Sequence, residues 1–287
     1  MRALRSSTLP APLLVLGGVV SVQFGGALAA TLIPGIGAGG AVTLRLGLGA
    51  VVLLLVARPR LRGRDWRDWR AAVGFGLTLG LMNLSFYLAL ARLPLGVAVT
   101  VEFIGPLGLA AVLSRRARDL VAVAVAAAGV VLVNGRDLHA VNWTGVGFGL
   151  LAGACWASYI LLSAETGRRF GQLDGLALAM VVGTAVVAPY GIATAGGTLV
   201  EPHNLLTGAA VAVLSSVLPY SLELLALRRI RPVVFGILMS LEPAVGALAG
   251  FSVLGQRLSV LQIGGMACVV AASIAVTRSR GTEQLDL

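Results

Sequence analysis

The chain has 287 residues, of which 57% are hydrophobic and only 12% are charged, with a formal net charge of +10 and a mean hydropathy of +0.93. Soluble domains usually carry about 25% charged residues, so 22 arginines and 12 acidic residues are too few to cover a globule of this size. Composition therefore excludes one large soluble domain and predicts an integral membrane protein. The chain has no lysine, and its arginines cluster between apolar runs as membrane topology signals do, so the positive charge does not indicate nucleic-acid binding.

The first apolar stretch allows two interpretations. Arg2 and Arg5 precede an apolar run that ends in "GALAAT", where Ala27 to Ala29 form an A-x-A-like pattern typical of secretory signal peptides. The run from Leu13 to Ile33 is nevertheless long enough to span a bilayer, and many more apolar runs follow it. We therefore expect a retained first helix.

Ten apolar runs follow one another along the chain, each near the length of about 20 residues that a membrane-spanning helix needs. They cover residues 13–33, 39–57, 71–91, 94–113, 119–134, 144–163, 175–195, 205–227, 232–253 and 258–277. Strands of a membrane barrel would be about 10 residues long with strict alternation, and the sequence lacks that pattern. The predicted fold class is an all-α integral membrane protein with ten transmembrane helices.

The arginine distribution predicts the orientation of these helices, because cytoplasmic segments carry an excess of positive charge. With the N-terminus inside, cytoplasmic segments hold 18 of the 22 arginines, and the outer loops hold only Arg92, Arg136 and Arg257. The remaining arginine, Arg45, lies within the second span. We expect both termini in the cytoplasm of a bacterial cell and the protein in the cytoplasmic (inner) membrane, as a multi-pass protein.

The segment "RPRLRGRDWRDWR", from Arg58 to Arg70, mixes arginines with Trp66 and Trp69. A nucleic-acid patch is one interpretation. The other is an interfacial segment, with arginines on anionic headgroups and tryptophans at the membrane–water boundary. We favour the second interpretation, which makes membrane lipid the expected partner.

Two segments of the chain align without a gap at a spacing of 137 residues. "ALARLPLGVAVTVEFIGP" ends at Pro106 and "ALRRIRPVVFGILMSLEP" ends at Pro243, and a glutamate precedes each proline. A five-helix unit that is repeated once must insert upside down the second time, because five is odd. We therefore expect two inverted five-helix repeats, 1–138 and 139–287, with a substrate site between them near the midplane, as in many secondary transporters.

The two quoted segments, with "GALAGFSVLGQRLS" after the second, resemble the EamA family of the drug/metabolite transporter superfamily. The opening "LLVLGGVVSVQFGGALAATLIPGIGAGGAVTLRLGLGAVVLL" is similar to the RhtA-like exporters within that family. The resemblance covers essentially the whole chain. It implies a secondary transporter that exports small amino acids such as threonine and homoserine, or related metabolites, by alternating access; the alternative is a transporter of another small metabolite or drug.

Four ionisable residues fall inside the predicted spans: Arg45, Glu102, Glu223 and Glu242. Such groups cost about 2.5–3.5 kcal/mol on insertion scales and normally face the bundle interior. At about 1.5 Å per residue, Arg45 and Glu102 lie about 10 to 12 Å from the outer ends of their spans. They form an ion pair that fixes helix packing, or they share one anionic or zwitterionic ligand. Glu223 lies near the inner end of its span, so it either reaches the interface or contributes to the site.

Glu242 lies about 15 Å deep, close to the midplane, and Pro243 follows it directly. A proline inside a helix removes a backbone donor and frees a carbonyl, so we expect helix kinks at Pro243 and Pro106. A free carbonyl beside a carboxylate could bind an ammonium group or carry a proton. The alternative is a kink next to a hydrogen-bonded glutamate without a role in transport.

Neutral polar and aromatic residues inside the spans could complete a pocket. They are Gln23, Asn83, Tyr87, Trp156, Tyr159 and Tyr220. Asn83 and Tyr87 are four residues apart and share a helix face, as do Trp156 and Tyr159 at a spacing of three. Glycines at a spacing of four, such as Gly145, Gly149 and Gly153, favour close helix packing instead.

Other classes of protein find less support in the sequence. The histidines, His139 and His203, both fall in outer loops, and neither a H-E-x-x-H nor a G-x-S-x-G motif occurs. Cys155 and Cys268 lie in separate apolar runs, which does not indicate a disulfide. We expect no enzyme, no metal, no cofactor and no nucleic-acid partner, and the sequence leaves a homodimer open. A channel would need a ring of repeated polar groups, and two equivalent halves fit alternating access better.

Overall fold

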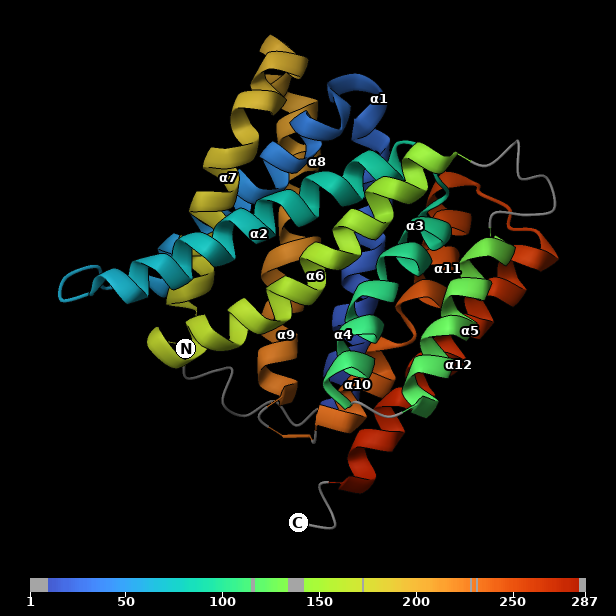
Figure 1. Ribbon diagram of the computed structural model, residues 1–287. Helices are drawn as coiled ribbons and strands as arrows, with labels where there is room; N and C mark the ends of the chain where they lie inside the picture. Colours follow the sequence, from blue (N-terminus) through green and yellow to red (C-terminus); the bar gives the residue numbers. More distant parts are fainter. Residues whose placement is uncertain are drawn as a thin grey trace.

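The computed structural model shows a bundle of helices (Figure 1) and describes residues 10–114, 117–133, 142–171, 173–227, 229–230 and 232–283. No strand occurs in these ranges. The helices are α1 Ala11–Ala57, α2 Trp66–Leu90, α3 Leu95–Glu102, α4 Ile104–Ser114, α5 Ala117–Val133, α6 Trp143–Arg169, α7 Asp174–Ala195, η2 Gly196–Val200, α8 Pro202–Ala212, η3 Val213–Val217, α9 Leu218–Leu227, α10 Pro232–Met239, α11 Glu242–Leu254 and α12 Val260–Glu283. The element η2 is a 3₁₀-helix and η3 is a π-helix.

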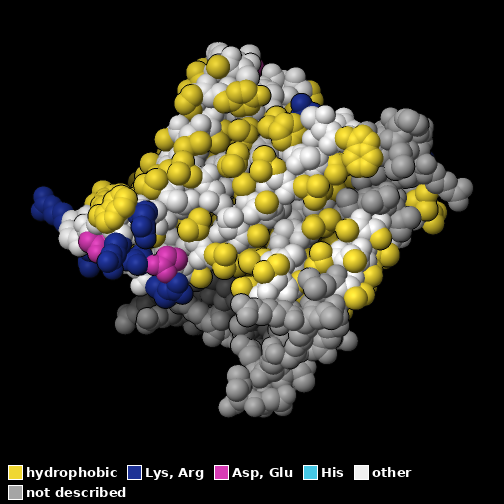
Figure 2. Space-filling model, viewed as in Figure 1, with side chains coloured by type: hydrophobic (Ala, Val, Ile, Leu, Met, Phe, Trp, Pro, Cys, Tyr) yellow, Lys and Arg dark blue, Asp and Glu magenta, His cyan; other side chains and the backbone are white. Residues whose placement is uncertain are grey.

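Eight helical segments among the described residues are long and apolar enough to cross a membrane. They are Ala11–Ala57, Trp66–Leu90, Leu95–Leu113, Trp143–Arg169, Asp174–Val200, Pro202–Glu223, Val234–Leu254 and Val260–Thr277. Apolar side chains cover much of the bundle face in Figure 2, whereas arginine and acidic side chains gather at one end. Large exposed apolar residues such as Leu55, with 68% of its surface exposed, face outward. The all-α membrane class predicted from the sequence is confirmed.

Several residues on which the sequence analysis relied fall outside the described ranges. They are Arg2, Arg5, Arg115, Arg116, Arg136, His139, Arg228 and Arg231. The predicted boundary between residues 138 and 139 falls outside these ranges as well.

The first two predicted spans differ from the structure in how they are joined. The sequence predicts a connection over 34–38, but helical backbone continues through it and is interrupted only at Gly37, with φ 70° and ψ 169°. Pro34 cannot donate to the carbonyl four residues earlier, and glycine adopts a positive φ without the strain that a Cβ would cause. The chain therefore bends at one residue and needs no loop.

Three other predicted spans are interrupted rather than continuous. The span predicted over 94–113 consists of α3 and α4, and the one over 232–253 consists of α10 and α11. The span predicted over 205–227 contains the π-helix η3 between α8 and α9. All three interruptions lie beside a proline, and all three adjoin the cavity described below.

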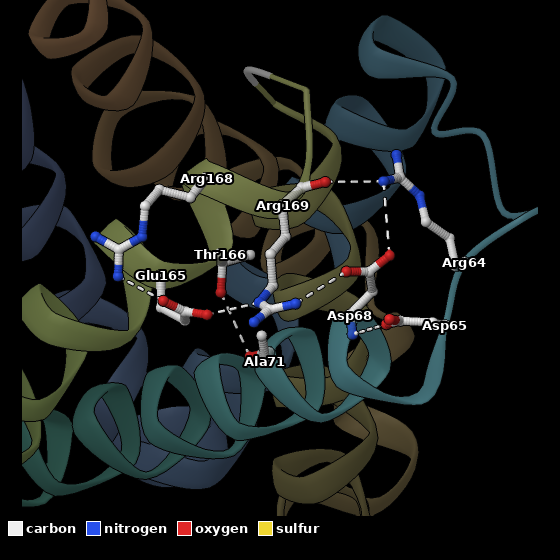
Figure 3. A network of polar contacts seen from close by, with 8 residues as sticks. All are labelled: Arg64, Asp65, Asp68, Ala71, Glu165, Thr166, Arg168 and Arg169. Atoms are coloured by element: carbon white, nitrogen blue, oxygen red, sulfur yellow. Dashed lines mark hydrogen bonds and ion pairs between the residues drawn. The ribbon is translucent and has the colours of Figure 1, made fainter.

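A polar network holds the start of α2 against the end of α6 (Figure 3). Arg169 donates from Nε to Glu165 at 2.6 Å and from Nη1 to Asp68 at 3.4 Å. Arg64 donates to the backbone carbonyl of Arg169 at 2.8 Å, and Asp65 caps α2 by accepting the Asp68 N–H at 2.8 Å. Partly exposed ion pairs contribute little individually, but these contacts fix the relative position of two helices that both line the cavity.

The helices pack closely where glycines remove side-chain bulk. The close packing predicted for the glycines of α6 is confirmed, because Gly145 faces Leu93 and Gly149 faces Val101. At Gly153, a Cβ would lie only 2.5 Å from the backbone carbonyl oxygen of Glu102. Small residues at such positions let backbones approach, so α6 supports the junction of α3 and α4 directly.

Gly153→Ala is expected to lower the melting temperature of the purified protein in detergent. Its new methyl group would overlap backbone at the α3–α4 junction, and overpacking of this kind costs about 1–3 kcal/mol. Gly147→Ala, on the same helix, is the control, because a Cβ there meets no atom within 4 Å. Equal melting temperatures for the two variants would contradict the packing assigned to α6.

Candidate functional site

A cavity of about 130 Å³ lies inside the bundle, where α1, α2, α3, α6, η3, α9, α10 and α11 meet. Its wall consists of Val22, Gln23, Gly26, Arg45, Met82, Asn83, Phe86, Glu102, Trp156, Tyr159, Ser215, Pro219, Tyr220, Glu223, Met239 and Glu242. All four ionisable residues that the sequence places inside the spans are on this wall. The structure thus gathers residues that are up to 220 positions apart, from Val22 to Glu242, around one small space.

The two broken helices bring two of the carboxylates to the wall. Glu102 is the last residue of α3, and Glu242 is the first residue of α11. Pro106 lacks the N–H that would bond the carbonyl of Glu102 four residues earlier, and Pro243 likewise leaves the carbonyl of Met239 without its helical donor. The helical ladder is interrupted at these points, so each break places a carboxylate and polar backbone beside the cavity.

Arg45 reaches the cavity from α1 and is held by η3. Its Nη2 donates to the backbone carbonyl of Ser215 at 2.9 Å, and its Nε donates to Oγ of Ser216 at 3.3 Å. Only 7% of Arg45 is exposed. Its guanidinium carbon also lies 5.7 Å from the ring centre of Tyr87, a distance typical of a cation–π contact.

Arg45 and Glu102 do not form the direct ion pair that the sequence left open. Both residues lie on the wall, but Arg45 bonds to η3 instead. Within the described part of the chain, none of Glu102, Glu223 and Glu242 forms an ion pair. One guanidinium and three carboxyl groups therefore face a common cavity without neutralising one another by contact.

The three carboxyl groups differ in burial. Glu242 is buried, with 6% of its surface exposed, while Glu102 and Glu223 are half-buried. Glu223 projects from α9 onto the wall, and its Cγ lies close to Gly18 of α1. The structure therefore places Glu223 at the cavity rather than only at the membrane interface.

Most of the neutral residues singled out in the sequence also reach the wall. Gln23, Asn83 and Tyr220 line it, and so do Trp156 and Tyr159 from α6. Trp156 packs edge-on against Phe103 at 5.5 Å between ring centres, and Tyr159 packs against Phe75 at 5.0 Å. These ring contacts fix the two aromatic side chains in place.

Tyr87 occupies a different position from the one expected. It is fully buried in the core beneath Arg45 and does not line the cavity. Its hydroxyl group has no hydrogen-bond partner among the described residues. The helical spacing of Asn83 and Tyr87 puts them on one face of α2, but that face is wide enough for one to meet the cavity and the other the core.

Sequence reasoning missed the contribution of η3 and of Pro219 in α9. Ser215 and Pro219 line the cavity, and Ser216 holds Arg45. One signal was available: Pro219 interrupts an apolar run as Pro106 and Pro243 do. The π-helix itself leaves no recognisable pattern in the sequence, and such helices are frequent at functional sites.

A bundle of membrane-length helices with broken helices around a charged internal cavity has the architecture of a membrane transporter. A model of the EamA-like transporter family matches residues 143–278. The threonine/homoserine exporter RhtA of Salmonella typhimurium (strain LT2) is 41% identical over 268 residues, which cover 92% of this chain and 90% of that protein. RhtA of Escherichia coli (strain K12) is 40% identical over 267 residues, with the same shares of each chain.

Two more distant similarities extend over most of the chain. Protein PecM of Dickeya dadantii is 29% identical over 234 residues, 78% of each chain. A solved crystal structure superposes with a TM-score of 0.65 at 17% identity and covers 94% of this chain and 98% of its own. The chain belongs to the EamA-like transporter family of the drug/metabolite transporter superfamily, in its RhtA-like subgroup. The transporter class expected from the sequence is thereby confirmed, and with it the multi-pass membrane location.

Proposed function

We propose that this protein is a secondary transporter of the bacterial inner membrane that exports small amino acids such as threonine, homoserine or closely related metabolites. The observation that carries the proposal is the cavity wall, with Arg45 and three carboxyl groups around about 130 Å³. Pockets for drug-sized ligands measure about 300–1,000 Å³, so the cavity fits a small solute better than a drug. The names of the RhtA relatives supply the direction of transport and the kind of substrate.

The charges of the wall match the two ends of an amino acid. A carboxylate would bind Arg45, whose planar guanidinium pairs with carboxylates in a bidentate manner. An ammonium group would bind among Glu102, Glu223 and Glu242, which have no ionic partner of their own in the described part of the chain. A carboxyl group that the substrate does not use is available to carry a coupling proton.

Ten membrane crossings account for the helices better than eight. At 1.5 Å per residue, the 47 residues of α1 would extend about 70 Å, more than twice the hydrocarbon thickness of about 30 Å. The break at Gly37 therefore separates two crossings, and α5, with 17 residues, supplies another at the short end of the spanning range of about 17–25 residues. An even number of crossings puts both termini on one side, which the arginine bias assigns to the cytoplasm.

The broken helices support two inverted repeats, 1–138 and 139–287. Both α3 and α10 have 8 residues, and their first residues, Leu95 and Pro232, are 137 positions apart, as are their last, Glu102 and Met239. Helix packing has matching symmetry: α5 packs on α12, and the packing of α2 on α6 corresponds to that of α8 and α9 on α1. The family model, at 143–278, falls within the second repeat.

Alternating access is supported by how the broken helices pack. Where α3 meets α11, Gly96 lies against Ala247 and Gly250 against Leu95. Gln256 accepts a hydrogen bond from the Leu95 N–H at 2.9 Å. The other halves, α4 and α10, do not pack on each other: α4 packs on α5, α6 and α12, whereas α10 packs on α1 and α12. This arrangement corresponds to a state closed on the α3–α11 side, which the arginine bias assigns to the outside.

Cysteine labelling tests the crossings. In a variant without Cys155 and Cys268, Gly35→Cys and Gly197→Cys should react with a membrane-impermeant maleimide added outside intact cells. Gly167→Cys should react only after the cells are opened. A Cβ meets no atom within 4 Å at any of these glycines, so the substitutions are structurally mild. Protection of Gly35→Cys under both conditions would instead place the Gly37 break inside the bilayer.

Glu102→Gln and Glu242→Gln should each lower threonine or homoserine counterflow in proteoliposomes by about tenfold or more, equivalent to about 1.4 kcal/mol. Each substitution keeps the side-chain size and removes an ionisable carboxyl group from the cavity wall. Glu201→Gln, at an exposed glutamate outside the cavity wall, is the matched control and should retain transport. Wild-type rates for both cavity variants, from mildly acidic to mildly alkaline pH, would exclude the assigned site. Linear, unsaturable flux in the wild type would indicate a channel.

A further inference from the structure

The orientation of Arg45 depends on two neighbouring residues of η3. Guanidinium carries five N–H donors in a rigid plane. Two of them are engaged, Nε with Oγ of Ser216 at 3.3 Å and Nη2 with the carbonyl of Ser215 at 2.9 Å. Because these bonds fix one edge of the plane, the direction of the remaining donors is fixed as well.

Pro219 explains why η3 has acceptors to offer to α1. In this π-helix the Leu218 N–H bonds to the carbonyl of Val213, five residues earlier. Pro219 has no N–H, so it cannot bond the carbonyl of Leu214 five residues earlier or that of Ser215 four residues earlier. Both carbonyls accept from α1 side chains instead: Ser21 donates to Leu214 at 2.6 Å, and Arg45 donates to Ser215.

The serine hydroxyl supplies the second fixed point. Ser216 is fully buried, with 0% of its surface exposed, and its Oγ accepts from Arg45 Nε. Without that hydroxyl group, the Ser215 carbonyl would be the one hydrogen-bond acceptor left of the two, and the cation–π contact with Tyr87 would allow the guanidinium to rotate about that bond. Glu102 lies on the same wall and would attract it. The hydrogen bond from Arg45 to Ser216 opposes that rotation and keeps Arg45 from pairing with Glu102.

We propose that Ser216 is a positioning residue that holds Arg45 ready for the carboxylate end of the exported amino acid, and that it thereby sets the selectivity for a free carboxylate over a neutral group. The proposal rests on the amino-acid export proposed above. Arg45 is the one cation on the described cavity wall. If Arg45 paired with Glu102, a substrate carboxylate would have to compete with that glutamate and would bind more weakly. An uncharged carboxamide would lose much less binding affinity.

The test compares threonine with threoninamide as competitors of threonine counterflow in proteoliposomes. Ser216→Ala should raise the KM for threonine by about tenfold and leave competition by threoninamide unchanged. The selectivity ratio, which is the apparent affinity for threonine divided by that for threoninamide, should therefore fall by the same factor. Ser216→Thr, which keeps the hydroxyl group, should restore the ratio. Ser85→Ala is the matched control, since Ser85 is a buried serine of α2 outside the cavity wall.

Three further variants keep the outcome decisive. Pro219→Ala returns an N–H that competes for the Ser215 carbonyl, the other contact that fixes Arg45, so it should lower the ratio as well, and Ser216→Cys should lower it if Ser216→Ala fails to fold. Arg45→Gln should abolish the preference for threonine. An unchanged ratio in Ser216→Ala and Pro219→Ala, with a reduced ratio in Arg45→Gln, would overturn the positioning role of Ser216 but not the proposed carboxylate site at Arg45. An unchanged ratio in Arg45→Gln would overturn the proposed carboxylate site as well.

Discussion

The constraint on which the rest of this structure depends is that a buried cation in a membrane needs polar partners. Arg45 satisfies this requirement with a carbonyl and a hydroxyl group of η3 rather than with a carboxylate. The choice of neutral partners leaves its charge available and leaves three cavity glutamates without an ion pair among the described residues. A polar site of this kind is unstable in a continuous apolar bundle, because isolated charges at bilayer depth are expensive. It is consistent with a site that a zwitterionic solute completes.

Prolines provide the polar backbone from which the cavity is built. Pro106, Pro219 and Pro243 each remove one donor from a helix that lines the cavity. The consequences differ: Pro219 frees carbonyls that bond to α1, whereas Pro106 and Pro243 divide helices beside Glu102 and Glu242. Close packing then compensates for the interrupted ladders, as where Gly153 of α6 lies against the carbonyl of Glu102. The halves α3 and α11 pack tightly against each other, while α4 and α10 do not pack on each other and meet only through α12. That difference gives the bundle a closed side and a side free to open.

Much of this arrangement could be predicted from the sequence, because membranes restrict what a chain can do. Apolar run length predicts the helices, and the expense of buried charge predicts that Arg45, Glu102 and Glu242 face one interior. The inaccuracies have local causes. A helix passes through Pro34 and breaks only at Gly37, since a single positive φ suffices to turn it. Tyr87 lies in the core because helical spacing defines a face but not the width of a cavity. The π-helix η3 was not predictable, since it depends on α1 as a partner.

The central claim is that the cavity binds an amino acid between Arg45 and the carboxylates, and Trp156 on the cavity wall can report it directly. In a variant with Trp66, Trp69 and Trp143 replaced by phenylalanine, Trp156 is the remaining tryptophan of the four in the chain. Titration of the purified protein with threonine or homoserine should change its fluorescence saturably. The same change should be absent when Arg45 is replaced by glutamine. A saturable signal of equal affinity with and without the Arg45 guanidinium would contradict the account.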